Sequence, residues 1–544
     1  MTTHTTSLIP ASDLVPAPAD MGLSCFSSWR PGQIQAIEEY IHYQGRFLAQ
    51  NMGTGFGKSG VCIADGFFTG NTLVLTSTKA LQKQYMDDFS ASGLVDVRGQ
   101  ANYTCTYKSY ANGDPYTCDE GADHKCRGRK DRTCSYSQAV DTAVGSQFVV
   151  TNYSYWVSLG RAESCPLAPH LLVLDEAHAA HDELCSIMTG IFHPVELSSA
   201  LAGEMVPELK TPSQISEWIN PRLYLVQQRL EELKANLDSG NKQVRASYRK
   251  TKELLNRLTL LAVADNEHWE MEISSDGVIT CSPVWASPYT EQWLFRGAPK
   301  ILLVSATVGQ KSLELLGIKG KGGEKTGNVF RFSCYPWDFP PENQPVYYCP
   351  TVRVDFRMDL MAEQRLIAFM VKVCREREDR KGIIHSVSYD RGKWIAVELS
   401  RAGIKGVLTH DPGQVEQAIE TYKQANHPMV LISPVVTTGY DFPGTDCEYQ
   451  IIMKVPTPDT RSPIMKRRCK EDPEYKPYLV AQTICQAVGR GRRSAQDSCE
   501  TFIPDVYFGD LWAKHQQFFP PDFRKLVHIR PGGAGITPLS KIKG

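Results

Sequence analysis

A glycine-rich segment followed by lysine and serine has the residue types that bind nucleotide phosphates. It spans residues 53–59 (GTGFGKS), between an apolar strand at 46–50 and a helix at 60–68. Glycine N–H groups can surround phosphate oxygens, and a helix N-terminus adds partial positive charge. Lys58 would reach the β- and γ-phosphates and Ser59 would ligate Mg²⁺, unless the segment is only a glycine-rich turn. The residues expected to bind ATP here are Gly53, Thr54, Gly55, Gly57, Lys58 and Ser59.

Two acidic residues and a histidine follow another apolar strand, in the sequence LLVLDEAH at 171–178. Carboxylates at the carboxyl end of a parallel strand face the ligand crevice of an open α/β sheet. Asp175 would hold Mg²⁺, and Glu176 would polarise the attacking water as general base. His178 would couple the site to a facing domain. The alternative is that these acidic residues only cap the next helix.

Two weaker patterns lie in the same half of the chain. Ser305 and Thr307 end the apolar segment KILLVSAT, and their hydroxyls would link bound nucleotide to a nucleic-acid track; an ordinary turn is the alternative. Arg30 and Gln33, upstream of the glycine-rich segment, would read the edge of adenine. The alternative there is a plain helix N-terminus with Pro31 at its first position.

A basic helix, ICQAVGRGRRS at 484–494, is the strongest pattern of the second half. Arg490 and Arg493 are three residues apart, so they would project from one face of this helix, which also carries Gln486. An arginine that stabilises charge on a transferred phosphoryl group raises its rate by roughly 10³–10⁵-fold. A solvated basic helix is the alternative. Thr437, Thr438, Gly439 and Asp441 follow a further buried strand, and Gly439 and Asp441 are expected to lie near the nucleotide.

Four cysteines form a third candidate site, separated by 12, 7 and 7 residues: Cys105, Cys118, Cys126 and Cys134. Four thiolates can hold a [4Fe–4S] cluster or Zn²⁺, and spacing alone does not choose between them. Four unligated cysteines are a further alternative. Between two of them runs RGRKDR, in which Arg127, Arg129 and Lys130 would face DNA phosphates, unless this is only a solvated loop.

Composition sets the broad class. The chain has 544 residues, of which 42% are hydrophobic and 22% charged, with a net charge of −1. This length predicts roughly three or four domains, and nucleic-acid binding would need local basic patches. There is no apolar run of about 18 residues and no signal peptide, so we expect a cytoplasmic protein without membrane contact. Its 16 cysteines are then not expected to form disulfides.

Apolar strands alternate with helices, which predicts a parallel sheet covered on both faces. The first half has such strands at 46–50, 71–76, 147–151, 170–174 and 300–307. Two amphipathic helices at 224–237 and 244–263 predict a helical hairpin, and HWEMEISSDGVITCSPV predicts a β-hairpin turning at Asp276-Gly277. A second α/β unit begins near residue 335. Its expected strands are 382–386, 429–433, 449–455 and 501–508.

In this order the segments RPGQ, MGTGFGKS, TSTKALQKQ, DEAH, SAT, TTGYDFPG and QAVGRGRR resemble the motif set of superfamily 2 helicases. RGQANYTC at 98–105 and TNYSYW at 151–156 resemble segments of the XPD/DinG branch. KVPTPDTRSP also resembles a segment of this branch, but Thr457 and Arg461-Ser462 depart from its pattern. The short length suggests a compact phage or mobile-element version.

The resemblance implies an α/β fold of two RecA-like motor domains, with an iron–sulfur domain and a helical arch inserted in the first. It favours a [4Fe–4S] cluster on the four cysteines. The expected parts are a disordered lead at 1–22, the first motor domain at 23–98, 141–180 and 298–334, the iron–sulfur domain at 99–140, the arch at 181–297 and the second motor domain at 335–544.

The same resemblance implies a monomeric, ATP- and Mg²⁺-dependent DNA helicase. It would translocate 5′→3′ on single-stranded DNA and unwind forked or tailed duplexes, with ATP hydrolysed between the motor domains. An RNA helicase and a nucleic-acid-dependent ATPase that does not unwind are the alternatives. The residues expected to contact the DNA backbone are Thr78, Thr307, Ser386 and Thr438.

Overall fold

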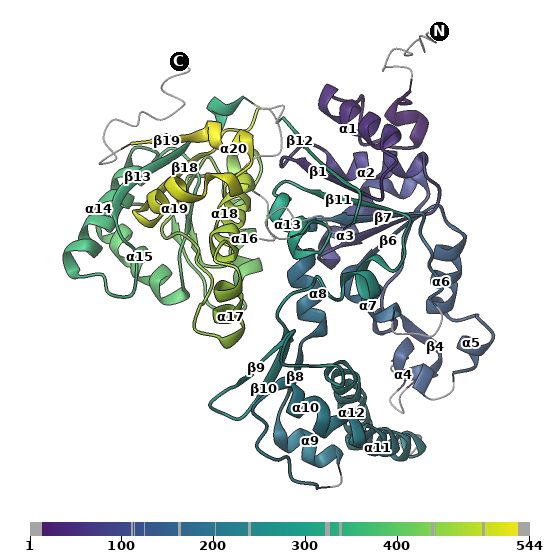
Figure 1. Cartoon of the computed structure of the whole chain (residues 1–544). Helices are drawn as coiled ribbons and strands as arrows, with labels where there is room; N and C mark the ends of the chain where they lie inside the picture. Colours follow the sequence, from purple (N-terminus) through teal and green to yellow (C-terminus); the bar gives the residue numbers. More distant parts are fainter. Residues whose placement is uncertain are drawn as a thin grey trace. The chain divides into compact units, whose positions relative to one another are not determined.

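The chain forms two compact α/β units, each built around a seven-stranded sheet (Figure 1). The first unit comprises residues 1–50, 58–333 and 459–471, and the second comprises 51–57, 334–458 and 472–544. The computed structural model describes residues 14–109, 113, 115–123, 126–160, 165–201, 203–237, 241–320, 327–336, 340–436, 440, 442–491 and 496–530.

The first sheet has the strand order β12-β1-β11-β7-β2-β6-β3. The pairs β11–β7, β7–β2, β2–β6 and β6–β3 are parallel, as the alternation of strands and helices predicts. The predicted strands are confirmed, whereas β3 and β12 carried no recognisable signal. The strands are β1 (Phe47–Met52), β2 (Thr72–Thr76), β3 (Leu94–Asp96), β6 (Phe148–Asn152), β7 (Leu171–Asp175), β11 (Lys300–Ser305) and β12 (Phe330–Tyr335). Their helices are α1 (Pro31–His42), α2 (Lys58–Phe67), α3 (Lys79–Phe89), α6 (Ser135–Gly145), α7 (Tyr153–Leu159), α8 (Ala180–Met188) and α13 (Gln310–Leu315).

Two insertions interrupt this sheet. The first, between β3 and β6, contains the antiparallel pair β4 (Thr104–Ser109) and β5 (Pro115–Thr117), with α4 (Cys118–Asp123) and α5 (Arg127–Lys130). The second, between β7 and β11, contains the predicted helical hairpin and β-hairpin, in which Ile273 pairs with Ile279. Its elements are β8 (Gly190–Phe192), α9 (Pro194–Ala200), α10 (Pro212–Ile219), α11 (Leu223–Ala235), α12 (Lys242–Leu261), β9 (Trp269–Ile273) and β10 (Ile279–Pro283).

The second sheet has the order β15-β16-β14-β17-β18-β13-β19, and its neighbouring strands are all parallel. The four predicted strands are confirmed as β14 (Gly382–His385), β16 (Val430–Ser433), β17 (Tyr449–Ile452) and β18 (Glu500–Asp505). The other strands are β13 (Val346–Val352), β15 (Val407–Leu408) and β19 (Val527–Ile529). The helices are α14 (Leu360–Arg375), α15 (Tyr389–Arg401), α16 (Val415–Gln424), α18 (Tyr475–Val488), α19 (Tyr507–His515) and α20 (Pro521–Leu526).

Two details differ from the expected division of the chain. Residues Pro18–Met21, inside the lead expected to be disordered, form a short 3-10 helix with Met21 buried. Helix α17 (Pro463–Glu471) follows β17 in the chain but packs in the first unit. There Arg468 Nε donates to the Val284 carbonyl (2.7 Å) and Trp285 Nε1 donates to Glu471 (2.7 Å).

Every described helix is too short or too polar to cross a membrane.

A buried carboxylate joins the carboxyl ends of three strands of the second sheet. Asp505, at the end of β18, accepts hydrogen bonds from the backbone N–H groups of Val354 (3.2 Å), Val455 (3.0 Å) and Tyr507 (3.1 Å). Val354 follows β13 and Val455 follows β17. A buried carboxylate needs such donors. Asp505 therefore fixes the loops at this edge of the sheet.

A buried ion pair supports the opposite end of the same strand. Arg377 and Glu500 are both inaccessible to solvent, and two guanidinium nitrogens each donate to a carboxylate oxygen at 2.8 Å. Arg380 adds a third, longer contact to Glu500 (3.3 Å). Charges removed from water are tolerated only when they are paired in this way.

We expect Arg377→Met to lower the free energy of unfolding of the second unit by about 3 kcal/mol, because Glu500 then keeps only its longer contact. Chemical denaturation of the full chain would measure the change. Arg375→Met, at the exposed last residue of α14 and two residues before Arg377, is the control and should change little. The double variant Arg377→Met/Glu500→Leu should recover much of the loss; no recovery would show that the ion pair is not the cause.

Candidate active site

The phosphate loop has the predicted strand–loop–helix form. β1 ends at Met52 and α2 begins at Lys58. Between them Gly55 and Gly57 adopt φ angles of 78° and 85°, a region that other residues rarely enter, so glycine is needed at both positions. Gly53 accepts a backbone hydrogen bond from Phe56 (3.1 Å), and Thr54 and Ser59 are partly accessible. This is the strand–loop–helix form in which backbone N–H groups and a helix N-terminus bind an anion.

Asp175 and Glu176 follow β7 at the carboxyl edge of the first sheet, as predicted. Asp175 is almost fully buried, with 2% of its surface exposed, and its carboxylate accepts hydrogen bonds from Tyr85 Oη and the Glu176 N–H, both at 2.9 Å. Glu176 Oε1 lies 4.0 Å from Lys58 Nζ. The fold thus brings the phosphate-loop lysine and the acidic pair to one edge, although more than 100 residues separate them in the sequence.

A hydrogen-bond network extends from Glu176 to the next strand. Parallel pairing of β7 with β11 sets Asp175 opposite Val304, so Ser305 lies beside the acidic pair. His178 Nδ1 lies 2.7 Å from Ser305 Oγ and 3.2 Å from Glu176 Oε2, and Ser305 Oγ also donates to Glu176 (3.2 Å). Thr307 N–H donates to Ser305 Oγ (3.1 Å). The coupling residues predicted from sequence, His178 and Ser305, therefore both contact Glu176.

Glu176 has an unusual backbone. Its φ of 50° places it in the left-handed region, which carries strain for a residue with a side chain. Only two other non-glycine residues among the described positions have a positive φ, namely Arg132 and Arg296. Such strain is often found at functional sites. Here it accompanies a carboxylate that faces both Lys58 and His178.

The two carboxylates differ in their electrostatic surroundings. Burial and the negative charge of Glu176 raise the pKa of Asp175 to about 6, against the lowering effects of Lys58 and the Tyr85 hydrogen bond. For Glu176, burial acts upward, but Lys58 and His178 together lower its pKa below the usual range. Glu176 is therefore the more readily ionised of the pair. An ionised carboxylate in this position can accept a proton from water.

Two tyrosines complete the site and were not predicted. Tyr85, on α3, donates to Asp175 and also hydrogen-bonds Ser59. Tyr153, at the start of α7, donates to the Asp175 backbone carbonyl (3.1 Å). Ser59 and Asp175 are thus linked through one hydroxyl, and an oxygen pair of this kind fits Mg²⁺. The segment around Tyr85 predicted only a helix, and the segment around Tyr153 only resembled a family segment. Neither pattern indicated that a tyrosine would contact Asp175.

The predicted adenine-reading residues have a local structural role. Gln33 is fully buried, and its Oε1 accepts a hydrogen bond from the Arg30 N–H at 2.8 Å. Arg30 caps α1, and Pro31 is the first helical residue. The alternative of a helix N-terminus thus describes the observed geometry. A contact of Arg30 or Gln33 with adenine stays a prediction.

The second unit supplies the arginine candidates, with one correction. The α-helix does not continue past Val488: α18 ends there, and Arg490 lies in a 3-10 turn over Gly489–Gly491. Two glycines in three residues disfavour a longer α-helix. Gln486 and Arg490 are partly accessible. Arg493, Thr437, Thr438, Gly439 and Asp441 lie outside the described residues.

The predicted DNA contacts differ in exposure. Thr78 is exposed and caps α3, where its Oγ accepts from Leu81 N–H (3.1 Å). Thr307 and Ser386 are buried, with 4% and 6% of their surface exposed. Arg127 is exposed and lies 3.7 Å from Asp131. The side chains of Arg129 and Lys130 lie outside the described part of the chain.

The four cysteines gather in the first insertion. All are buried and free of disulfides. They approach in two pairs, with Sγ–Sγ distances of 3.8 Å for Cys105–Cys126 and 3.9 Å for Cys118–Cys134. An added Cβ at Gly121 would lie only 2.5 Å from Cys105 Sγ, so the glycine leaves room for this group of sulfurs.

Their thiols are not equivalent. Burial and the nearby thiols, Cys134 first, raise the pKa of Cys118 to about 12. For Cys134, burial acts upward, but hydrogen bonds from the Ser137 hydroxyl and N–H lower its pKa. Cys134 caps α6, and a helix N-terminus stabilises a thiolate. Within the described residues, no three His, Cys, Asp or Glu side chains are close enough to hold one metal ion.

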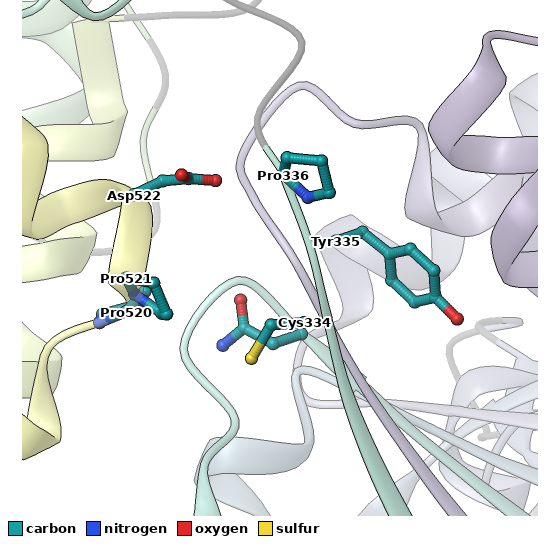
Figure 2. A pocket seen from close by; sticks show the side chains of 7 residues that line it. Cys334, Tyr335, Pro336, Pro520, Pro521 and Asp522 are labelled. Carbon is teal, nitrogen blue, oxygen red and sulfur yellow. The ribbon is translucent and has the colours of Figure 1, made fainter.

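The second unit also contains a pocket of about 190 Å³, which no sequence pattern indicated (Figure 2). Cys334–Pro336 at the end of β12 line it, together with Asn51 and with Pro520–Asp522 at the start of α20. Burial and Asp522 raise the pKa of the Cys334 thiol to about 11. The thiol is therefore neutral near pH 7, and Asp522 is the acidic group of this pocket.

Known proteins share this architecture. Residues 370–525 match the family model of the helicase C-terminal domain. A solved XPD helicase structure is 14% identical with a TM-score of 0.61, covering 93% of this chain and 100% of its own. An apo XPD structure has 14% identity and a TM-score of 0.57, with 92% and 99% coverage. For Xpd4 of S. tokodaii the values are 14%, 0.53, 92% and 100%. No curated protein matches the chain in sequence.

These matches confirm the resemblance drawn from the sequence motifs. The chain has the fold of the solved XPD helicase structures, with two RecA-like parallel sheets, and its residues 370–525 match a helicase C-terminal domain.

Proposed function

We propose that this protein is an ATP-dependent helicase that translocates 5′→3′ on single-stranded DNA and unwinds forked or tailed duplexes. The observation that carries the proposal is the contact of Glu176 with Lys58, His178 and Ser305 at the carboxyl edge of the first sheet. This contact brings together Lys58, expected to bind phosphate, and Glu176, expected to accept a proton from water. It also includes Ser305 at the end of β11, where the nucleic-acid track is expected.

Each residue has a defined role in this proposal. The phosphates of ATP bind the N–H groups of the loop 53–57 and Lys58. Mg²⁺, held through Ser59 and Asp175, would neutralise charge on the phosphates. Glu176 accepts the proton of the attacking water, while Ser305 and His178 fix its carboxylate. Gln486, Arg490 and Arg493 of the second domain stabilise the charge that develops on the γ-phosphoryl group.

The cysteine domain is proposed to hold a [4Fe–4S] cluster. The support is that four buried thiols without disulfides gather in one insertion, whose flanking segments resemble the XPD/DinG branch. The two Sγ–Sγ distances of 3.8 and 3.9 Å are also those of a tetrahedral zinc site, so the iron and zinc content of the purified protein tests this assignment. The cluster would brace the small domain that we expect to part the duplex.

The direction and the substrate can be tested together. We expect displacement of the short strand from a DNA duplex with a 5′ single-stranded tail and little from one with a 3′ tail, because the resemblance of the sequence motifs to the XPD/DinG branch implies this polarity. The assay would use matched DNA and RNA tails with ATP. Displacement on RNA tails alone would favour an RNA helicase. DNA-stimulated ATP hydrolysis without any displacement would favour the non-unwinding ATPase.

A further inference from the structure

A second pocket, of about 200 Å³, lies at the carboxyl edge of the second sheet. β14 ends at His385, β16 at Ser433 and β17 at Ile452, and these three strands are parallel neighbours, so their ends meet here. Ligands of open α/β sheets bind outside this edge. The pocket is therefore in the place where a ligand of the second domain is expected.

The lining has apolar walls and few polar groups. Val387, Pro434, Pro456 and Ala487 supply apolar surface, and 51% of the Val387 surface is exposed. Pockets for whole drug-sized ligands have about 300–1,000 Å³, so this smaller one suits a single planar ring system. Apolar walls of this kind favour the face of a nucleobase over a phosphate group, which needs donors on several sides.

The polar lining groups suit the rest of a nucleotide. Lys454 lines the pocket, and its positive charge also acts on the buried Asp505 carboxylate: burial raises the pKa of Asp505, and Lys454 acts to lower it. Ser386 and Thr457 add hydroxyls, which can donate to or accept from base edges and phosphate oxygens. A lysine can pair with a phosphate group, and the two hydroxyls can hydrogen-bond the edge of a base whose face contacts the apolar walls.

The pocket is also connected to the arginine turn. Ala487, which lines it, belongs to α18, three residues before Arg490. His385 Nε2 lies 2.8 Å from Gln450 Oε1, and Gln450 Nε2 donates to the Val488 carbonyl (3.4 Å). Ala487 and Val488, the residues reached in these two ways, are the last two residues of α18, directly before the turn Gly489–Gly491. A group seated in the pocket would therefore contact the element that carries Gln486 and Arg490.

We propose that this pocket binds one unstacked nucleobase of the translocating strand, that Lys454 pairs with the adjoining phosphate, and that base binding acts through α18 on ATP hydrolysis. The inference rests on the proposed function, because it names a subsite of the same DNA track. It assigns base contact to Val387 and Thr457 and phosphate contact to Lys454.

The test compares a labelled oligothymidylate with a strand of equal length that has central abasic sites, by fluorescence anisotropy on the full chain. Wild type should bind the intact strand about tenfold more tightly, as one base contact allows. Val387→Met and Thr457→Met fill the pocket without adding an aromatic ring, so each should remove this difference while binding the abasic strand normally. Lys454→Ala should weaken both strands equally. At saturation, the abasic strand should stimulate ATP hydrolysis less than the intact strand.

Matched controls are Val397→Met, on an exposed position of α15, and Lys405→Ala. Lys405 is exposed and lies just before the amino end of β15, whereas the pocket lies at the carboxyl ends of the strands. Both should behave as wild type, and thermal unfolding followed by circular dichroism would confirm that all variants fold. If both pocket-filling variants keep the preference for intact DNA, or weaken both strands alike, the base pocket is wrong. If wild type binds no single-stranded DNA, the proposed function itself fails.

Discussion

Replacing Lys58 by alanine is expected to reduce ATP hydrolysis by about 10²–10³-fold, as loss of one preorganised charge-stabilising group does in other enzymes. Lys58 Nζ lies 4.0 Å from Glu176 Oε1, and the other donors of the loop 53–59 are neutral N–H and hydroxyl groups. Without it, the γ-phosphate loses its main positive partner in the first domain. Phosphate release in the presence of single-stranded DNA would measure the effect.

The matched control for this variant is Lys250→Ala, an exposed lysine of α12 outside the site. It should retain wild-type turnover. Glu176→Gln is a useful companion, because it keeps the size of the side chain but removes the base. It should also abolish turnover while leaving nucleotide binding intact. Normal hydrolysis by Lys58→Ala would disprove the assignment of the phosphate loop.

Replacing Cys118 by serine is expected to remove the iron–sulfur absorbance near 400 nm and to abolish strand displacement. Cys118 is buried beside Cys134, and loss of one thiolate leaves one iron without its protein ligand. The small domain has few other means of stabilisation: its sheet has two strands, and its buried cluster comprises Cys105, Tyr116 and Cys126. Iron content and absorbance per chain would measure the loss.

A buried cysteine elsewhere gives the control for this substitution. Cys374→Ser, in the core of the second unit, buries the same hydroxyl without touching the four-cysteine group, so iron content should be unchanged. Basal ATP hydrolysis by Cys118→Ser should fall less than strand displacement, because the insertion lies outside the first sheet. A colourless wild type that contains one zinc ion per chain would overturn the cluster.

Local sequence patterns determined much of this protein. Apolar runs did not predict β13, but they predicted β1, β2, β6, β7 and β11 of the first sheet and β14, β16, β17 and β18 of the second, because strands buried on both faces need continuous apolar residues. The hairpin turn at Gly277 and the loop glycines Gly55 and Gly57 were predictable for a similar reason: their positive φ angles suit glycine. Acidic residues directly after a strand were correctly placed at the carboxyl edge, since strand direction fixes that edge.

Edge strands and helix ends were less predictable. β3, β15 and β19 have only two or three residues each, too few for a pattern of burial. The predicted basic helix was too long, because two arginines three residues apart are typical of one helix face. The observed end at Val488 depends on Gly489 and Gly491.

Sequence alone therefore indicated most of the central strands, the phosphate loop, the acidic pair and the four cysteines, because each depends on residues that are close together in the chain. Only the tertiary structure decided that Tyr85 and Tyr153 hold Asp175, that Ser305 and His178 share Glu176, and that the cysteines approach in pairs. It also decided that α17 packs in the first unit and that strand ends enclose a pocket. These features depend on strand order and side-chain direction, which join residues that are distant in the sequence.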